Sequence, residues 1–283
     1  MDSVKVQIIL YWISVGFYAV ATILLFSSTI FGKGRFLKPS LFIAAAGFVA
    51  HTAALILRWK QTGHFPYWGT YEVFASYAWG AVAFYLIVQL FRPNLKILGA
   101  LVLPLSFIMI GIAVMTSTEV KEIPRTFFTY WLGIHILFAK LSYGSALIAA
   151  GVGILYLLKE SSELRGQVLP LLEKLPDIKK LDYLNYRFVV FAFIMLLIMI
   201  ASGSVWAYKA WGRYWGWDPI ETWAFISWLV YGFYLHLRIT YRWQGKRSAW
   251  MSIFCLLLVL FAFFGIPLIY PSVHEHLKYS GLA

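Results

Sequence analysis

Eight long apolar runs, separated by short polar stretches, organise the chain. The runs cover residues 7–30, 38–58, 70–91, 95–116, 127–158, 187–208, 220–241 and 248–270. A membrane-spanning helix needs about 20 mostly apolar residues, so each run predicts one transmembrane helix. The expected fold class is all-α: a polytopic membrane helical bundle with about eight transmembrane helices, treated as a single domain over residues 1–283.

The fifth run, 127–158, is longer than one bilayer requires. At about 1.5 Å per residue it reaches about 48 Å, so the helix is expected to project beyond the hydrocarbon on at least one side. The following segment, about 159–186, mixes Leu, Pro, Lys and Glu. We expect it to be a cytoplasmic interfacial segment.

Composition supports the membrane assignment. Of the 283 residues, 61% are hydrophobic and 13% are charged, whereas soluble domains average about 25% charged residues. A water-soluble enzyme and a disordered chain are therefore excluded. The single cysteine, Cys255, excludes an intrachain disulfide framework and covalent haem attachment through a CxxCH motif on this chain.

Basic residues are unevenly distributed between the loops. The net charge is +12, which in a membrane protein indicates cytoplasmic loops and not nucleic-acid binding. The loops after the first, third, fifth and seventh runs hold about 15 Lys and Arg, and the other loops together with the two terminal segments hold about 8. Both termini and the loop before the seventh run are therefore expected on the outer side of the membrane.

Tryptophan is concentrated around that last outer loop. Six of the 13 Trp lie between positions 206 and 228, in W-A-Y-K-A-W-G-R-Y-W-G-W-D-P-I-E-T-W and just after it. One interpretation is an aromatic belt at the headgroup level, but a belt scatters Trp over all spans. We favour a platform for a flat apolar ligand, because aromatic faces stack on such ligands. The loop is taken as about 206–223. The nearby Lys209 and Arg213 suit an acidic group on that ligand.

The acids of this segment have a second interpretation. Asp218-Pro219-Ile220-Glu221 is a helix-start pattern, with Asp at the N-cap, Pro at the first position and Glu at the third. Asp218 and Glu221 therefore either cap the seventh span or serve the ligand, and the sequence leaves both roles open.

Two histidines flank the tryptophans on the expected outer side. His135 lies about 34 Å from the cytoplasmic end of the fifth run, and His274 follows the last run. Two outer histidines beside an aromatic platform suit bis-imidazole ligation of haem iron. A zinc site would need more ligands at close spacing, whereas only His274 and His276 are close in sequence.

His236 lies near the cytoplasmic end of the seventh run, and His51 lies deep in the second. Their heights differ by about 12 Å, whereas the two axial ligands of one iron are about 4 Å apart. They are not expected to share a metal. A ligand partner for His236 would come from another chain.

The segment W-G-R-Y-W-G-W-D-P-I-E-T-W resembles the tryptophan-rich "WWD" signature of haem-handling proteins in cytochrome c maturation. The chain is most similar to the CcsA/ResC family, the haem-delivery subunit of the System II cytochrome c synthase. L-R-W-K-Q-T-G-H-F-P, T-Y-E-V-F and W-L-V-Y-G-F-Y-L-H-L-R also resemble that family. The resemblance covers about 57–91 and 127–276.

The resemblance implies haem b as the ligand and substrate, and an apocytochrome c with a CcsB/ResB-like membrane subunit as partners. His135 and His274 match the histidines that ligate haem at the outer face. His236 matches one that holds a second haem within the membrane. The residues implied to hold the outer haem are Trp211, Trp215, Trp217, Asp218 and Trp223. The membrane would be a bacterial plasma membrane or a thylakoid. The chain would count as an enzyme only as a subunit of a holocytochrome c synthase, a cytochrome c haem lyase.

Two departures and three rival functions accompany this resemblance. Tyr67-Trp68-Gly69-Thr70 replaces the family's usual Ser-Asn-Leu, which weakens any role assigned to Glu72, and His276 is an extra histidine beside His274.

The rival functions are a HemX-like protein that influences haem synthesis, a haem carrier without ligase activity, and a transporter whose Trp and His are structural.

Overall fold

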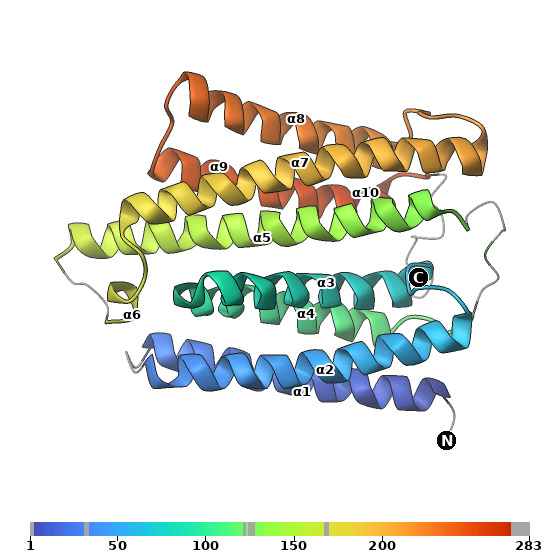
Figure 1. The fold of residues 1–283 in the computed structure, drawn as a ribbon, viewed down its shortest axis with the longest axis horizontal. Helices are drawn as coiled ribbons and strands as arrows, with labels where there is room; N and C mark the ends of the chain where they lie inside the picture. The colour runs from blue at the N-terminus through green and yellow to red at the C-terminus, as the bar shows by residue number, and fades with distance from the viewer. Residues whose placement is uncertain (1–2, 31–33, 121–122, 124–127, 167–169, 273–283) are drawn as a thin grey trace. The chain divides into compact units, whose positions relative to one another are not determined.

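The structure is a computed structural model that describes residues 3–30, 34–120, 123, 128–166 and 170–272. Within these residues the regular structure is helical and contains no β-strand. The chain divides into two compact units. Unit 1 comprises residues 1–120, 162–176 and 279–283, and unit 2 comprises residues 121–161 and 177–278. Figure 1 labels the helices of both.

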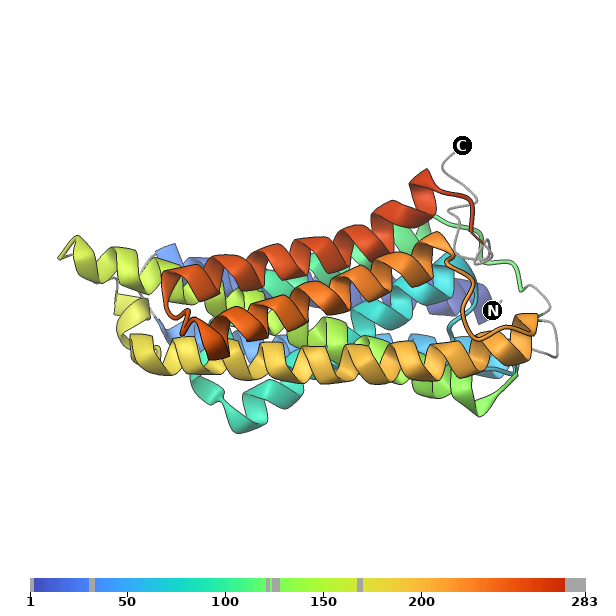
Figure 2. The ribbon, with the colours of Figure 1, turned by 90° about the horizontal axis from the view of Figure 1, so that it is seen from above.

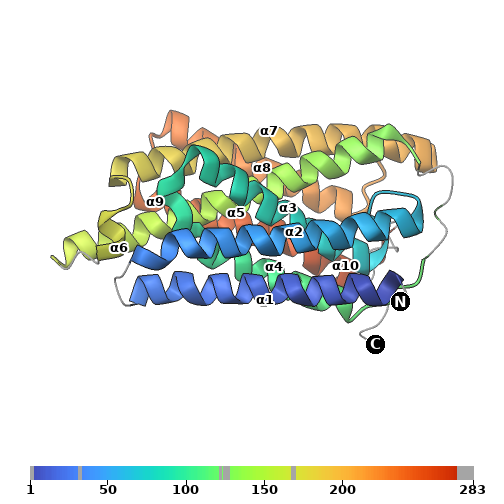
Figure 3. The ribbon, with the colours of Figure 1, turned by 60° about the horizontal axis from the view of Figure 1, so that its bottom comes forward.

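Four long helices build unit 1: α1 (Ser3–Ile30), α2 (Leu37–Thr62), α3 (Gly69–Phe91) and α4 (Gly99–Val114). Short helices η1 (Gly34–Phe36), η2 (Pro93–Leu98) and α6 (Pro170–Glu173) accompany them. α1 packs along α2 and against α4, and α3 packs against α4. Figure 3 shows α1 and α2 running side by side. Fully buried tyrosines fill much of the space between these helices, namely Tyr11, Tyr18, Tyr71 and Tyr85.

His51 is a core residue of unit 1. Its side chain is fully buried. Its Nε2 lies 3.0 Å from the carbonyl oxygen of Ala75, and its Nδ1 lies 3.3 Å from the hydroxyl of Tyr18. Because a carbonyl oxygen can only accept, Nε2 donates and Nδ1 accepts from the tyrosine. Both ring nitrogens are therefore used in joining α1, α2 and α3.

Unit 2 contains α5 (Tyr130–Leu164, whose last turn belongs to unit 1), α7 (Ile178–Trp211), α8 (Pro219–Thr240) and α9 (Lys246–Leu260). A π-helical turn, η4 (Phe261–Gly265), links α9 to α10 (Ile266–Ile269). α7, α8 and α9 pack against one another, and Figure 2 shows them running lengthwise.

Polar side chains tie these helices together inside unit 2. The buried amide of Asn185 donates to the carbonyl of Ala149 at 2.8 Å and to Ser252 at 2.7 Å, and it accepts from Tyr234 at 2.8 Å. Near one end of α8, Arg238 donates to Asp182 at 2.8 Å. These long-range bonds align the helices that carry the candidate site.

In the part of the chain that the structure describes, each of the eight apolar runs lies mainly within a helical segment. Seven helical segments of the described residues are long and apolar enough to cross a membrane. α8 has 22 residues, contains Glu221, His236 and Arg238, and is not among these seven segments. The prediction of an all-α polytopic membrane protein is confirmed, and the chain is a multi-pass membrane protein.

The structure differs from the predicted boundaries most clearly around 159–186. Residues 159–164 continue α5, and residues 178–186 are the first turns of α7. Asp177 caps α7 by accepting from the backbone N–H of Lys180 at 2.7 Å. The exposed Lys179 and Lys180 interrupt the apolar run but not the helix, because Leu181 and Leu184 continue its buried face. Of the predicted interfacial segment, residues 170–173 form the only helix separate from α5 and α7 that the structure describes.

Candidate functional site

The tryptophan loop, defined here as residues 212–218, connects α7 to α8. Gly212 ends α7 in the left-handed conformation, with φ 74°. Trp217 also has a positive φ, 57°, which is rare and strained for a bulky side chain. The loop therefore reverses the chain within seven residues and presents Trp217 with 69% of its surface exposed.

Two acids hold the end of this loop. The Asp218 carboxylate accepts from the backbone N–H of Ile220 at 3.0 Å. The Glu221 carboxylate accepts from the N–H of Gly216 at 2.8 Å and from that of Asp218 at 3.3 Å. Together they form a capping box at the start of α8. The capping interpretation is confirmed for both acids, and a ligand role of Asp218 stays a prediction.

The predicted tryptophans form separate edge-to-face contacts. Trp211 packs on Trp206 with ring centroids 4.9 Å apart, and Trp215 packs on Trp217 at 5.8 Å. Trp223 lies further along α8 and packs on Phe261 of the π-helical turn at 5.1 Å. The tryptophan loop and the first turns of α8 thus form an aromatic surface within unit 2.

His135 of α5 packs against the C-terminal part of α7, which leads into the tryptophan loop. Its Nδ1 lies 2.8 Å from the carbonyl oxygen of Met199 in α7. Its ring is nearly parallel to that of Trp206, with centroids 6.3 Å apart and an interplanar angle of 19°. The structure therefore brings His135, a predicted haem ligand, against the helix that leads into the tryptophan loop. His135 and Met199 are 64 residues apart in the sequence.

The chain before the second predicted outer ligand is fixed to the same place. Ser272 donates to the Asp218 carboxylate at 2.8 Å, so this segment lies at the N-terminus of α8. His274 and His276 lie outside the described residues, and the ligand role of His274 stays a prediction.

His236 lies near the other end of α8, on its exposed face. Its Nδ1 is 3.3 Å from the hydroxyl of Thr240, and Tyr241 packs edge-on at 5.7 Å. Within the described residues, no group of three or more His, Cys, Asp and Glu is arranged to hold a metal ion. The predicted haem-ligand role of His236 is not tested by these contacts.

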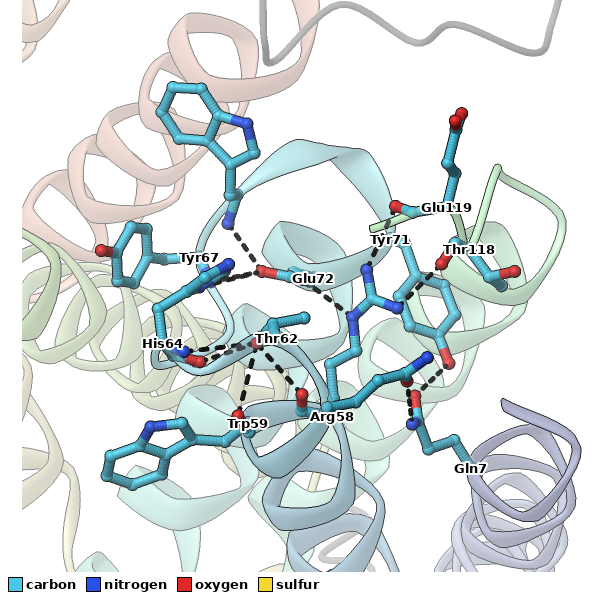
Figure 4. A network of polar contacts seen from close by, with 12 residues as sticks. Gln7, Arg58, Trp59, Thr62, His64, Tyr67, Tyr71, Glu72, Thr118 and Glu119 are labelled. Carbon is cyan, nitrogen blue, oxygen red and sulfur yellow. Dashed lines mark hydrogen bonds and ion pairs between the residues drawn. The ribbon is translucent and has the colours of Figure 1, made fainter. Parts of the chain in front are cut away.

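Sequence reasoning missed a buried charged network in unit 1 (Figure 4). The Arg58 guanidinium donates from Nε to Glu72 at 2.8 Å, with both side chains at most 3% exposed. Arg58 also donates to the carbonyl of Thr118 at 2.8 Å and to that of Glu119 at 3.4 Å. Glu72 accepts from the backbone N–H groups of Tyr67 at 3.1 Å and Trp68 at 2.9 Å.

This network fixes the first aromatic loop, defined here as residues 63–68, between α2 and α3. His64 is buried, and its Nδ1 lies 2.9 Å from the carbonyl of Phe65 and 3.8 Å from Glu72. Burial, and then the Glu72 charge, raise the pKa of Tyr67. One sequence feature could have indicated this ion pair: Glu72 lies in the first turn of the third span, and Arg58 lies near the end of the second.

Further contacts in Figure 4 join the ends of α1, α2 and α3. Gln7 of α1 donates to Gln61 of α2 at 2.7 Å and accepts from Tyr71 of α3 at 3.4 Å. The start of α1, the end of α2 and the start of α3 therefore lie at one end of unit 1, as expected for spans that alternate in direction.

Comparison with known proteins identifies a family model and several relatives. The family model described as "Cytochrome C assembly protein" matches residues 67–274. The chain is 32% identical over 249 residues to the cytochrome c biogenesis protein CcsA of Prochlorococcus marinus, covering 78% of each chain. It is 34% identical over 229 residues to CcsA of Chlamydomonas reinhardtii, in a match that covers 78% of this chain and 64% of that relative.

A solved structure has a similar fold. The cytochrome c haem lyase CcmF matches with a TM-score of 0.68 and 15% identity, over 93% of this chain. The chain spans about half of that protein, 47% of its length. The similarity is one of fold.

Proposed function

We propose that this chain presents haem b at the outer membrane face for covalent attachment to apocytochrome c. The premise is that the chain belongs to the cytochrome C assembly protein family as a CcsA-type member. A CcsB/ResB-type membrane subunit is the proposed partner. The observation that carries the proposal is the placement of His135, 2.8 Å from the Met199 carbonyl and stacked on Trp206 of the tryptophan segment.

The hydrogen bond of His135 defines its chemistry. A carbonyl oxygen can only accept, so Nδ1 carries the proton that is donated to Met199. In the neutral ring the lone pair is then on Nε2, the atom suited to ligate iron. His274 supplies the second ligand in this proposal, and the Ser272–Asp218 bond holds the preceding chain at the start of α8.

The tryptophans hold and shield the macrocycle. Trp217 and Tyr214 expose 69% and 56% of their surfaces, so they offer ring faces for stacking on the haem. Lys209 and Arg213 are exposed in the same segment of the chain and are suited to its propionates. These contacts orient the haem and exclude water.

Attachment needs no nucleophile from this chain. The S–H of each apocytochrome cysteine adds across a haem vinyl group, forming one C–S and one C–H bond with no leaving group. The contribution of the chain is to position the vinyl groups and to hold the iron through histidine ligands.

A second haem site at His236 completes the proposal. This side chain is exposed on α8, so it can meet a ligand from the CcsB/ResB-type subunit. Haem would move from this site to the tryptophan loop. A haem carrier without ligase activity would share both sites but would attach no haem to the CxxCH thiols.

The test is the absorption spectrum of the purified protein, produced with and without a CcsB/ResB-type partner, for wild type and for His135→Ala, His274→Ala and His236→Ala. We expect a six-coordinate haem spectrum that the two outer-histidine variants weaken and added imidazole restores. Production of a holocytochrome c from a co-expressed apocytochrome then separates attachment from carriage. Absence of haem in every preparation that contains the partner would contradict the proposal.

A further inference from the structure

We propose that Gly203 is a positioning residue that, together with the Met199 carbonyl and Trp206, forms a socket for the His135 imidazole. The inference rests on the proposed haem function. Because Gly203 has no side chain, His135 can adopt the orientation in which it is hydrogen-bonded to Met199.

The socket occupies one face of α7. Met199, Gly203 and Trp206 are separated by four and three residues, so they lie on the same side of the helix. Met199 accepts the Nδ1–H of His135 at 2.8 Å, and Trp206 stacks near the imidazole with centroids 6.3 Å apart. Gly203 is the member of this face between them.

The space at Gly203 is filled by the imidazole itself. A Cβ added there would lie 2.6 Å from His135 Nδ1 and 2.9 Å from its Cε1. Both distances are well below ordinary van der Waals contact. The imidazole is a rigid ring hydrogen-bonded at the nearer of these atoms, so it could not relieve the collision while keeping its bond to Met199.

A glycine at this position has an intrinsic cost. Glycine inside a helix is less favourable than alanine by about 0.5–1 kcal/mol. Gly203 has no positive φ, so backbone geometry does not require it. Close approach of His135 is therefore the feature of unit 2 that accounts for glycine at this position.

The socket sets both tautomer and orientation. Metal-ligating histidines commonly donate their other ring N–H to a carbonyl, and loss of such a partner typically lowers metal affinity by about 10–100-fold. Displacement of the ring by an alanine methyl group would break the Nδ1–H bond and turn Nε2 away from its ligating direction.

The test compares Gly203→Ala with Gly133→Ala in the full chain co-expressed with its partner. Gly133 lies in α5 two residues before His135, and a Cβ there has nothing within 4 Å. We expect Gly203→Ala to lower haem affinity by about 10–100-fold, measured by haem titration of the purified protein, and imidazole to restore the six-coordinate spectrum. Gly133→Ala should match wild type.

A second pair of variants separates positioning from a general disturbance of α7. Without added imidazole, His135→Gly and His135→Gly/Gly203→Ala should show the same residual haem affinity, because no ring remains at position 135 for the alanine methyl group to displace. A further loss in the double variant would overturn the proposal.

The outcomes for this inference and for the proposed function are distinct. If His135→Ala leaves the haem spectrum unchanged, the proposed function fails at this ligand. If His135→Ala weakens haem binding but Gly203→Ala does not, the socket is wrong and the haem function stands.

Discussion

The first aromatic loop of unit 1 and the tryptophan loop of unit 2 are built on the same backbone plan. Each begins with a left-handed glycine, Gly63 with φ 77° or Gly212 with φ 74°. Each has a positive φ just before or at the start of the next helix, 76° at Gly69 and 57° at Trp217. In both, a carboxylate from the first turn of that helix accepts two backbone N–H groups of the loop region.

The two loops differ in how that carboxylate is held. Glu72 is 2% exposed and paired with Arg58, which also holds the carbonyls of Thr118 and Glu119. Among the described residues, Glu221 bonds to backbone N–H groups and forms no ion pair. The carboxylate of the first loop is therefore also tied to a neighbouring segment through Arg58, whereas that of the tryptophan loop is held by backbone N–H groups. Trp217 in the tryptophan loop stays 69% exposed.

The largest expected contrast is between the two arginines. Arg58→Ala leaves the buried Glu72 charge without its partner, which should lower the free energy of unfolding by about 3–5 kcal/mol. Arg213→Ala, at an exposed position, should change it by less than about 0.5 kcal/mol. Thermal unfolding of the purified protein in detergent measures both. Similar losses in the two variants would show that the loops are equally dependent on charge.

A second contrast concerns the positive φ angles. Gly69→Ala places a side chain at φ 76° and should cost about 1–2 kcal/mol. Trp217→Gly removes the same kind of strain and also a mostly exposed side chain, so stability should stay within about 1 kcal/mol of wild type. Haem binding should nevertheless fall. Thermal unfolding and haem titration test the pair, and an unchanged haem affinity of Trp217→Gly would remove Trp217 from the site.

A smaller effect is expected at the start of α8. Asp218→Ala removes the N-cap and should cost about 1 kcal/mol, whereas Asp218→Asn keeps a capping oxygen and should cost less. Ser272→Ala removes the hydroxyl that donates to Asp218 and should cost about 0.5–1.5 kcal/mol. Ser204→Ala is its control, because that hydroxyl bonds to Ala201 within its own helix. The unfolding temperature of Ser272→Ala should be lower than that of Ser204→Ala.

The smallest effect is a pH dependence of the first loop. The pKa of Tyr67 is raised above 10.0, first by burial and then by Glu72. A group with a raised folded-state pKa contributes stability that is full below its unfolded pKa and is lost as pH rises through the folded pKa. Unfolding temperatures measured from about pH 9 upward should therefore fall less for Tyr67→Phe than for wild type. Equal pH slopes would exclude Tyr67 as the titrating group.

Local sequence information was sufficient for the spans and for one cap. Each apolar run became part of a helix because a membrane-length apolar segment satisfies its own backbone only as a helix. The Asp218–Glu221 cap was readable because all its atoms come from neighbouring residues. The prediction missed the extension of α7 back to Ile178. The apolar run stops where charged residues occur, although the helix continues through them as an amphipathic segment.

Contacts between distant residues were decided only by the tertiary structure. The sequence placed His135 on the side of the tryptophans, but not its bond to Met199 or its contact with Gly203. It contained Arg58 and Glu72 without showing that they pair with each other and with the 118–119 carbonyls. Hydrophobic periodicity determines which segments become helices. The rotation and depth at which two helices meet depend on side-chain packing along their whole length, and those determine which polar atoms come within hydrogen-bonding distance.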